Sequence, residues 1–92
     1  MNEMYSIEGK VAVVTGAAGV LGGSIASHFA SQGANVVALV HRPEQVETVL
    51  EKLKALGGDP TCYACSVMDT EVLAGIAEEV VAKYGKIDTL VN

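Results

Sequence analysis

The segment with the clearest potential for chemistry is a glycine-rich loop, Thr15-Gly16-Ala17-Ala18-Gly19-Val20-Leu21-Gly22. An apolar run from Val11 to Val14 precedes it, and a helix-forming segment from Ser24 to Gln32 follows it. A strand, a glycine turn and a helix in this order place a helix N-terminus and several free backbone N–H groups against a phosphate. The loop therefore favours phosphate binding. The alternative is a tight turn that packs a helix on a strand and binds nothing.

The spacing of the glycines excludes two common phosphate loops. A Walker loop ends in Gly-Lys-Ser/Thr, which is absent here, and Gly-x-Gly-x-x-Gly would need a glycine at Ala18. The pattern that remains is Thr-Gly-x-x-Gly-x-x-Gly. In it, Gly16 is free to adopt a φ that other residues avoid, while Gly19 and Gly22 allow backbone or ligand to approach closely.

A second candidate for chemistry is the pair Cys62-x-x-Cys65, a spacing found in redox and zinc sites. These residues fall in a predicted strand, Thr61 to Cys65, where positions three apart point to opposite faces. At ~3.3 Å per residue their Cα atoms would lie roughly 10 Å apart, and a disulfide tolerates only about 7 Å. The spacing in this setting predicts two core thiols.

Composition narrows the class of protein. The 92 residues carry a net charge of −5 with no basic block, which argues against a nucleic-acid-binding surface. The N-terminus lacks a cationic start followed by an apolar run, and no apolar run approaches the roughly 18 residues of a membrane span. We expect a cytoplasmic protein that binds neither nucleic acid nor membrane. With one Phe and no Trp, its core must be aliphatic.

Strands and helices alternate around the loop. Strands are predicted over 11–14, 35–40, 61–65 and 87–91, with amphipathic helices between them. Gly33 and Gly85 are placed to end helices, Pro43 to begin one, and Asp69 to cap one. This β-α-β-α-β-α-β order predicts an α/β fold, a Rossmann-type doubly wound parallel sheet. In such dinucleotide-binding sheets the first and fourth strands are neighbours, and the ligand binds where they meet.

The loop resembles that of the short-chain dehydrogenase/reductase family, in which Thr-Gly directly follows the first strand. The extended branch of that family, of epimerases and dehydratases, has Thr-Gly-x-x-Gly-x-x-Gly, as here. The single-domain branch has Thr-Gly-x-x-x-Gly-x-Gly, and Val20 stands where that pattern needs a glycine. The segment from Lys83 to Asn92 nevertheless resembles the single-domain run "Tyr/Phe-Gly-x-Ile-Asp-x-Leu-Val-Asn", and it favours that branch.

The resemblance covers the chain from Ile7 onward and implies that residues 1–92 are the N-terminal part of one dinucleotide-binding domain. It places cofactor contacts at Gly16, Ala18, Gly19 and Leu21. Asn92 matches the first Asn of the family's Asn-Asn-Ala-Gly motif. The family usually has an Asp-Val pair facing the adenine, and this sequence has Ser66-Val67, so that contact would be either weakened or remade by the Ser66 hydroxyl.

Cofactor choice is expected to depend on the end of the second strand. An acidic residue there bonds the ribose 2′-hydroxyl of NAD, whereas an Arg suits the 2′-phosphate of NADP. Val40, His41 and Arg42 include no carboxylate, and a guanidinium binds phosphate through two bonds at once. NADP is therefore favoured, with NAD as the second choice, and His41 and Arg42 are candidate contacts. The alternative is that Arg42 is a free surface charge.

The resemblance implies hydride transfer between a nicotinamide and an alcohol or ketone, in a protein that forms homo-oligomers. The family's catalytic Ser and Tyr-x-x-x-Lys do not occur in these residues, so no catalytic residue is assigned. The loop segment Gly19-Val20-Leu21-Gly22 is similar to that of reductases acting on sugar acids such as fructuronate/mannonate or gluconate. Two alternatives stay open: a nucleotide-binding module without catalysis, and an extended-branch epimerase or dehydratase.

Overall fold

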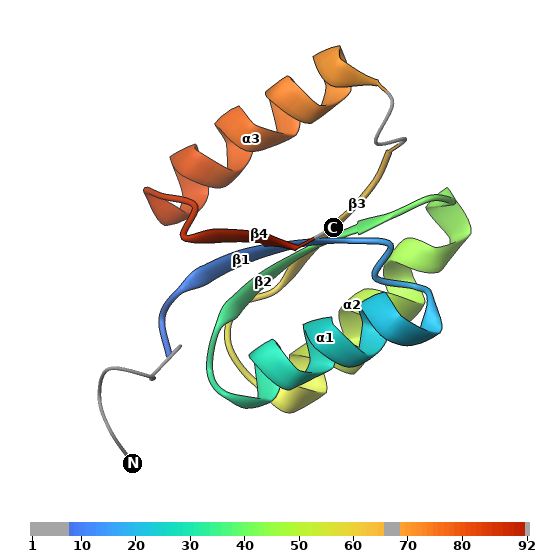
Figure 1. The fold of residues 1–92 in the computed structure, drawn as a ribbon, viewed down its shortest axis with the longest axis vertical. Helices are drawn as coiled ribbons and strands as arrows, with labels where there is room; N and C mark the ends of the chain where they lie inside the picture. The colour runs from blue at the N-terminus through green and yellow to red at the C-terminus, as the bar shows by residue number, and fades with distance from the viewer. Residues whose placement is uncertain (1–7, 66–68, 92) are drawn as a thin grey trace.

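The computed structural model describes residues 8–65 and 69–91, which form a parallel sheet flanked by helices (Figure 1). The elements, in chain order, are β1 (Val11–Thr15), α1 (Val20–Ser31), β2 (Asn35–Val40), the 3₁₀ helix η2 (Pro43–Gln45), α2 (Val46–Leu56), β3 (Thr61–Ala64), α3 (Thr70–Tyr84) and β4 (Thr89–Val91). The strand order is β3-β2-β1-β4, and every pairing is parallel. The predicted doubly wound sheet, with its first and fourth strands as neighbours, is confirmed.

One face of the sheet packs against α1 and α2 (Figure 1). The core of this layer is entirely aliphatic, as the composition requires. Ala26 and Ala30 contribute only methyl groups from α1, which lets that helix lie close to the strands. The buried residues of the layer are Val14, Ala17, Ala26, Ala30, Val36, Ala38, Val40, Val49 and Leu53.

The opposite face is covered, within the described part of the chain, by α3 (Figure 1). Neighbouring residues of β1 and β2 alternate between the two layers, so both strands are apolar on both faces, as expected for a parallel sheet with helices on either side. A cavity of about 410 Å³ remains between α3 and the β1–β4 half of the sheet. The buried residues of this layer are Val11, Val13, Val37, Leu39, Ile76 and Val80.

The helix boundaries predicted at Gly33, Pro43, Asp69 and Gly85 are confirmed. The Asp69 carboxylate accepts a hydrogen bond from the Val72 N–H at 3.2 Å and so caps the start of α3. Gly33 and Gly85 follow α1 and α3 with φ of +87° and +83°, in the left-handed region that favours glycine. Pro43 begins η2, which continues into α2. None of the described helices is long and apolar enough to cross a membrane.

β4 begins at Thr89, two residues later than the sequence predicts. Asp88 explains the difference, because its backbone N–H donates to the Val11 carbonyl at 2.9 Å while its carboxylate accepts from the Val11 N–H at 2.8 Å. Lys86 lies 3.2 Å from the same carboxylate. The bond from Val11, together with Lys86, lowers the pKa of Asp88. Asp88 thus joins the start of β1 to the start of β4.

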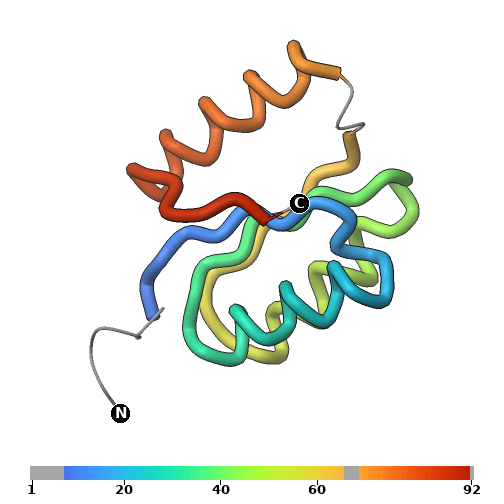
Figure 2. The backbone as a smooth tube through the Cα atoms, viewed as in Figure 1, coloured from blue at the N-terminus to red at the C-terminus, as the bar shows by residue number. Residues whose placement is uncertain are grey.

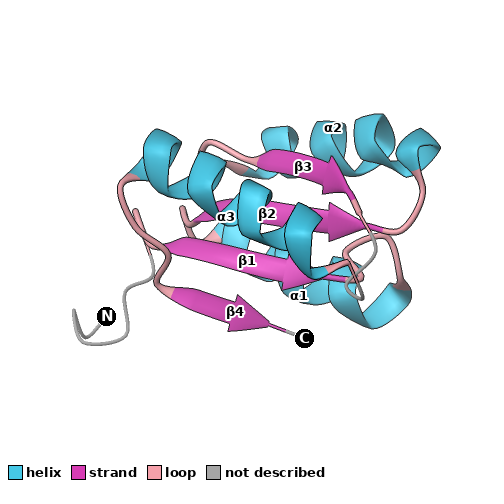
Figure 3. Cartoon of the chain, turned by 90° about the horizontal axis from the view of Figure 1, so that it is seen from above, coloured by secondary structure: helices cyan, strands magenta, loops and turns pink. Residues whose placement is uncertain are grey.

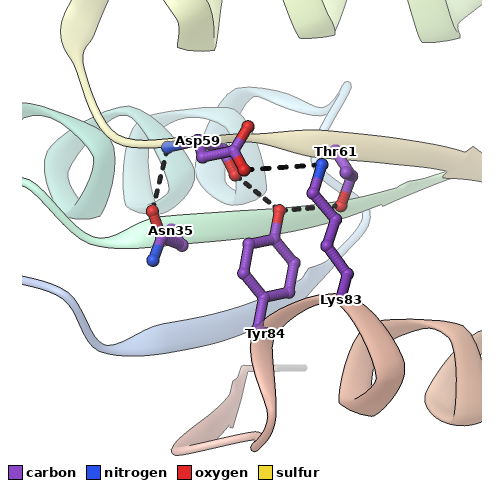
Figure 4. Close-up of polar contacts among 5 residues, drawn as sticks. All are labelled: Asn35, Asp59, Thr61, Lys83 and Tyr84. Carbon is purple, nitrogen blue, oxygen red and sulfur yellow. Dashed lines mark hydrogen bonds and ion pairs between the residues drawn. The ribbon is translucent and has the colours of Figure 1, made fainter.

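A polar group of five residues, here called the Asp59 cluster, joins α3 to the turn before β3 (Figure 4). The Tyr84 hydroxyl donates to the Asp59 carbonyl at 2.5 Å and lies 3.4 Å from the Thr61 Oγ1. The Asn35 side chain accepts from the Asp59 N–H at 2.9 Å. Lys83 completes the cluster, with its Nζ 3.5 Å from the Asp59 carboxylate. The end of α3 is therefore held at the starts of β2 and β3.

We expect Tyr84→Phe to lower the free energy of unfolding by about 1 kcal/mol, the net contribution of one neutral hydrogen bond. Urea denaturation of the wild-type chain and the variant would measure the loss. Tyr63→Phe is the matched control, because the Tyr63 hydroxyl has no hydrogen bond to any residue described in the structure. Equal stability of Tyr84→Phe and wild type would contradict a stabilising role for the Asp59 cluster.

Candidate functional site

The glycine loop lies at the carboxyl edge of the sheet. All strands run in the same direction (Figure 3), and the turns after β1 and β2 meet at one end of the molecule (Figure 2). Thr15 pairs with Leu39, and the Ala17 N–H donates to the Leu39 carbonyl at 3.2 Å. The loop after β1 is therefore fixed directly to the end of β2.

Within the loop, one glycine makes the turn and another permits close packing. Gly16 has a φ of +62°, as the sequence predicts for the turn position. A Cβ placed on Gly22 would lie 2.2 Å from the Gly16 carbonyl oxygen, and one on Gly19 would lie 3.3 Å from it. Gly22 therefore serves backbone packing, since α1 can approach the turn only where no side chain intervenes.

α1 begins at Val20, four residues before the Ser24 predicted from sequence. Glycine disfavours helix interiors, but the close packing of α1 on the turn places Gly22 and Gly23 inside the helix. Gly19 is the N-cap, in an extended conformation with φ of −77° and ψ of 168°. The helix therefore starts within the loop itself.

The first turn of α1 has the features of an anion site. No side chain caps it, and it contains no acidic residue. The N–H groups at a helix start have no partner within the helix, and the helix dipole favours a negative group there. Gly16, Ala18, Gly19 and Leu21 are all exposed around this turn, so a ligand has access to it.

The end of β2 is held by a reciprocal pair of hydrogen bonds. The Arg42 N–H donates to the Gln45 Oε1 at 3.2 Å, and the Gln45 N–H donates to the Arg42 carbonyl at 3.0 Å. The side chains of His41 and Arg42 are exposed beyond the buried Val40. Sequence reasoning missed Gln45. Its place three residues after Arg42, the N-cap residue that precedes Pro43, is the local signal of a capped helix start.

A cavity of about 560 Å³ lies between α1 and α2. The glycine loop forms one of its walls, and Glu44 and Gln45 of η2 contribute to the opposite wall. Among its lining residues are Ala17, Ala18, Gly19, Ser24, Gln45 and Thr48.

The structure places six of the nine residues predicted to contact a cofactor. Gly16, Ala18, Gly19 and Leu21 lie in the loop after β1, and His41 and Arg42 follow β2 at the same edge. The other three, Ser66, Val67 and Asn92, lie outside the described residues. Contact of any of the nine with a cofactor stays a prediction.

Cys62 and Cys65 are free thiols that pack on opposite faces of the sheet, as the strand geometry predicts. Cys62 contacts the layer of α1 and α2, and Cys65 contacts the layer of α3. Burial raises the pKa of Cys62 to about 11, and burial together with Asp69 raises that of Cys65. Across 8–65 and 69–91, no three His, Cys, Asp or Glu side chains gather as a metal site requires.

We expect Gly22→Ala to lower the free energy of unfolding by about 1–3 kcal/mol, as overpacking does elsewhere, because its methyl group would overlap the Gly16 carbonyl. Chemical denaturation would measure the change. Gly75→Ala is the matched control, since a Cβ there meets no atom within 4 Å and should stabilise α3 by about 0.5–1 kcal/mol. A Gly22→Ala variant as stable as wild type would show that this contact is not required.

We expect Cys62 to react slowly with iodoacetamide at neutral pH, because the thiolate is the nucleophile and the pKa of Cys62 is raised to about 11. In a Cys65→Ser variant, the alkylation rate should rise about tenfold per pH unit up to at least pH ~10, whereas an unperturbed thiol levels off near its pKa of ~8.5. Mass spectrometry would follow the reaction. A plateau near neutral pH would contradict an inert core thiol.

Comparison with known proteins places this geometry in a family. A family model described as short chain dehydrogenase matches residues 10–92. Among curated proteins, the 2,3-dihydro-2,3-dihydroxybenzoate dehydrogenase of Bacillus subtilis (strain 168) is 40% identical over 86 residues, which cover 94% of this chain and 33% of that protein. The chain spans about a third of the length of the curated relatives it matches.

Two solved structures share the fold. The NAD+-bound xylitol dehydrogenase is 33% identical with a TM-score of 0.86, over 91% of this chain and 32% of that one. A metagenomic short-chain oxidoreductase in complex with NADP is 36% identical with a TM-score of 0.84, over 92% of this chain and 38% of that one. With all but its first nine residues matched by the family model, this chain belongs to the short-chain dehydrogenase family.

Proposed function

We propose that the chain is the cofactor-binding half of an NAD(P)-dependent oxidoreductase that interconverts an alcohol and a ketone. The observation that supports this most directly is the uncapped first turn of α1, which opens beside β1 at the point where the strand order reverses toward β4. In doubly wound sheets this is where a dinucleotide binds. The two solved relatives contain NAD+ and NADP, respectively.

The residues of the loop fit a pyrophosphate. Gly16 turns the chain, Gly19 starts the helix, and the contact of Gly22 with Gly16 holds the helix start next to the turn. Backbone N–H groups at the start of α1 would bind the phosphate oxygens, with Ala18 and Leu21 flanking them. The nicotinamide of the cofactor supplies the hydride chemistry when bound.

NADP is the proposed cofactor, with NAD as the second choice. Val40 is buried at the end of β2, and neither His41 nor Arg42 offers the carboxylate that would bond a ribose 2′-hydroxyl. The exposed Arg42 side chain supports recognition of a 2′-phosphate, because a guanidinium forms paired charge-assisted hydrogen bonds with it.

The proposed substrate class rests on the sequence alone. The Gly19-Val20-Leu21-Gly22 segment supports a sugar acid of the fructuronate/mannonate or gluconate kind. The sequence contains no Tyr-x-x-x-Lys, so we place the groups that transfer the proton in polypeptide outside these residues. A cytoplasmic homo-oligomer completes the proposal.

The missing Tyr-x-x-x-Lys also favours a second candidate, a nucleotide-binding module without catalysis. The two candidates differ in one measurement. Incubation with NADPH and a panel of ketones, including keto sugar acids, should oxidise NADPH if the protein that contains this chain is a reductase. Tight binding of NADPH without any oxidation across the panel would favour the module.

We expect Arg42→Ala to weaken NADPH binding about tenfold or more, since charged hydrogen bonds contribute roughly 1.5–3 kcal/mol. NADH binding should change less than about twofold, because NADH lacks the 2′-phosphate that Arg42 would contact. Isothermal titration calorimetry would compare the two cofactors. Lys54→Ala removes the same charge from the exposed side of α2 and is the control. Equal losses for NADPH and NADH would show that Arg42 does not contact the 2′-phosphate.

A further inference from the structure

Gln45 has a fixed orientation at the end of β2. The N–H of Arg42 can only donate, so the atom of Gln45 that meets it at 3.2 Å must be the amide oxygen. The backbone bond from the Gln45 N–H to the Arg42 carbonyl, at 3.0 Å, closes the same turn. Gln45 is therefore bonded to Arg42 through both its side chain and its backbone.

In this orientation the amide NH₂ of Gln45 is the group that remains available to a ligand. The side chain lines the cavity that it shares with Ala17, Ala18 and Gly19. Within the described residues, no hydrogen bond uses the Gln45 Nε2. Gln45 thus offers the two donors of its amide NH₂ to a ligand in this cavity.

We propose that Gln45 is a second specificity-determining residue, whose Nε2 donates to the 2′-phosphate of the cofactor beside Arg42. The proposal rests on the NADP-binding function proposed above. A phosphate has acceptors enough for both residues, because a guanidinium engages two of its oxygens and leaves the third for the amide. Gln45 lines the cavity across from the glycine loop and is bonded to Arg42, in the segment after β2 that recognises the adenosine 2′ position in dinucleotide-binding folds.

The Gln45→Glu variant distinguishes recognition of the 2′-phosphate by Gln45 from a role of Gln45 in holding the turn after β2 alone. Glu retains a carboxylate oxygen to accept from the Arg42 N–H, so the turn after β2 is preserved. It replaces the NH₂ donor with an acidic oxygen, which repels a phosphate and still accepts from a 2′-hydroxyl. Gln45→Ala removes the acceptor and the donor together.

The probes are adenosine 2′,5′-bisphosphate and adenosine 5′-monophosphate, which differ at the 2′ position and contain no nicotinamide. Isothermal titration calorimetry of the full chain would give both affinities. We expect Gln45→Glu to weaken the bisphosphate about tenfold, equivalent to about 1.4 kcal/mol, and the monophosphate by less than about twofold. Gln32→Glu adds the same charge at the far end of α1 and should change neither affinity.

Two results would overturn the role of Gln45. One is a Gln45→Glu variant that binds the bisphosphate as tightly as wild type does. The other is an equal loss for both nucleotides, which would assign Gln45 to the turn alone. In either case an Arg42→Ala variant that still loses bisphosphate affinity would leave the NADP proposal intact. If wild type fails to prefer the bisphosphate and Arg42→Ala changes nothing, both proposals fail.

Discussion

The contact between Gly22 and the carbonyl of Gly16 is the constraint on which the candidate site depends. α1 can begin at the loop only because no side chain separates its first turn from the turn at Gly16. This close approach brings the helix start to the carboxyl edge of β1, where its free N–H groups are exposed. A glycine that weakens a helix by its intrinsic propensity is here the residue that positions the helix.

The sheet could be predicted because its signals are local. β1 and β2 are continuous apolar runs, which is what burial on both faces demands. Asp69 and Gly85 mark the ends of α3 through contacts with residues a few positions away, so sequence spacing alone located them. The parallel arrangement follows from the alternation of strands and helices, and the strand order from the pattern of dinucleotide-binding sheets.

The contacts that sequence reasoning missed depend on residues far apart in the chain. Asp88 bonds to Val11 across 77 positions, and Tyr84 reaches Asp59 across 25. The periodicity of the sequence does not predict such partners, because these residues come together only when the chain folds. Gln45 is different, because its partner Arg42 is only three residues away. Its significance emerges from the cavity it shares with the glycine loop, which again only the folded chain reveals.

The cavity beneath α3 has a consequence for how the molecule fluctuates. α3 buries Ile76 and Val80 against the sheet, leaves Val72 and Val81 more than two-fifths exposed, and is fastened mainly near its end by Tyr84. The layer of α1 and α2, by contrast, contains nine buried residues in the described part of the chain, against six in the layer of α3. Local unfolding follows the least buried unit. We therefore expect the amide hydrogens of α3 to exchange with solvent through local openings in which β1, β2 and the glycine loop stay folded.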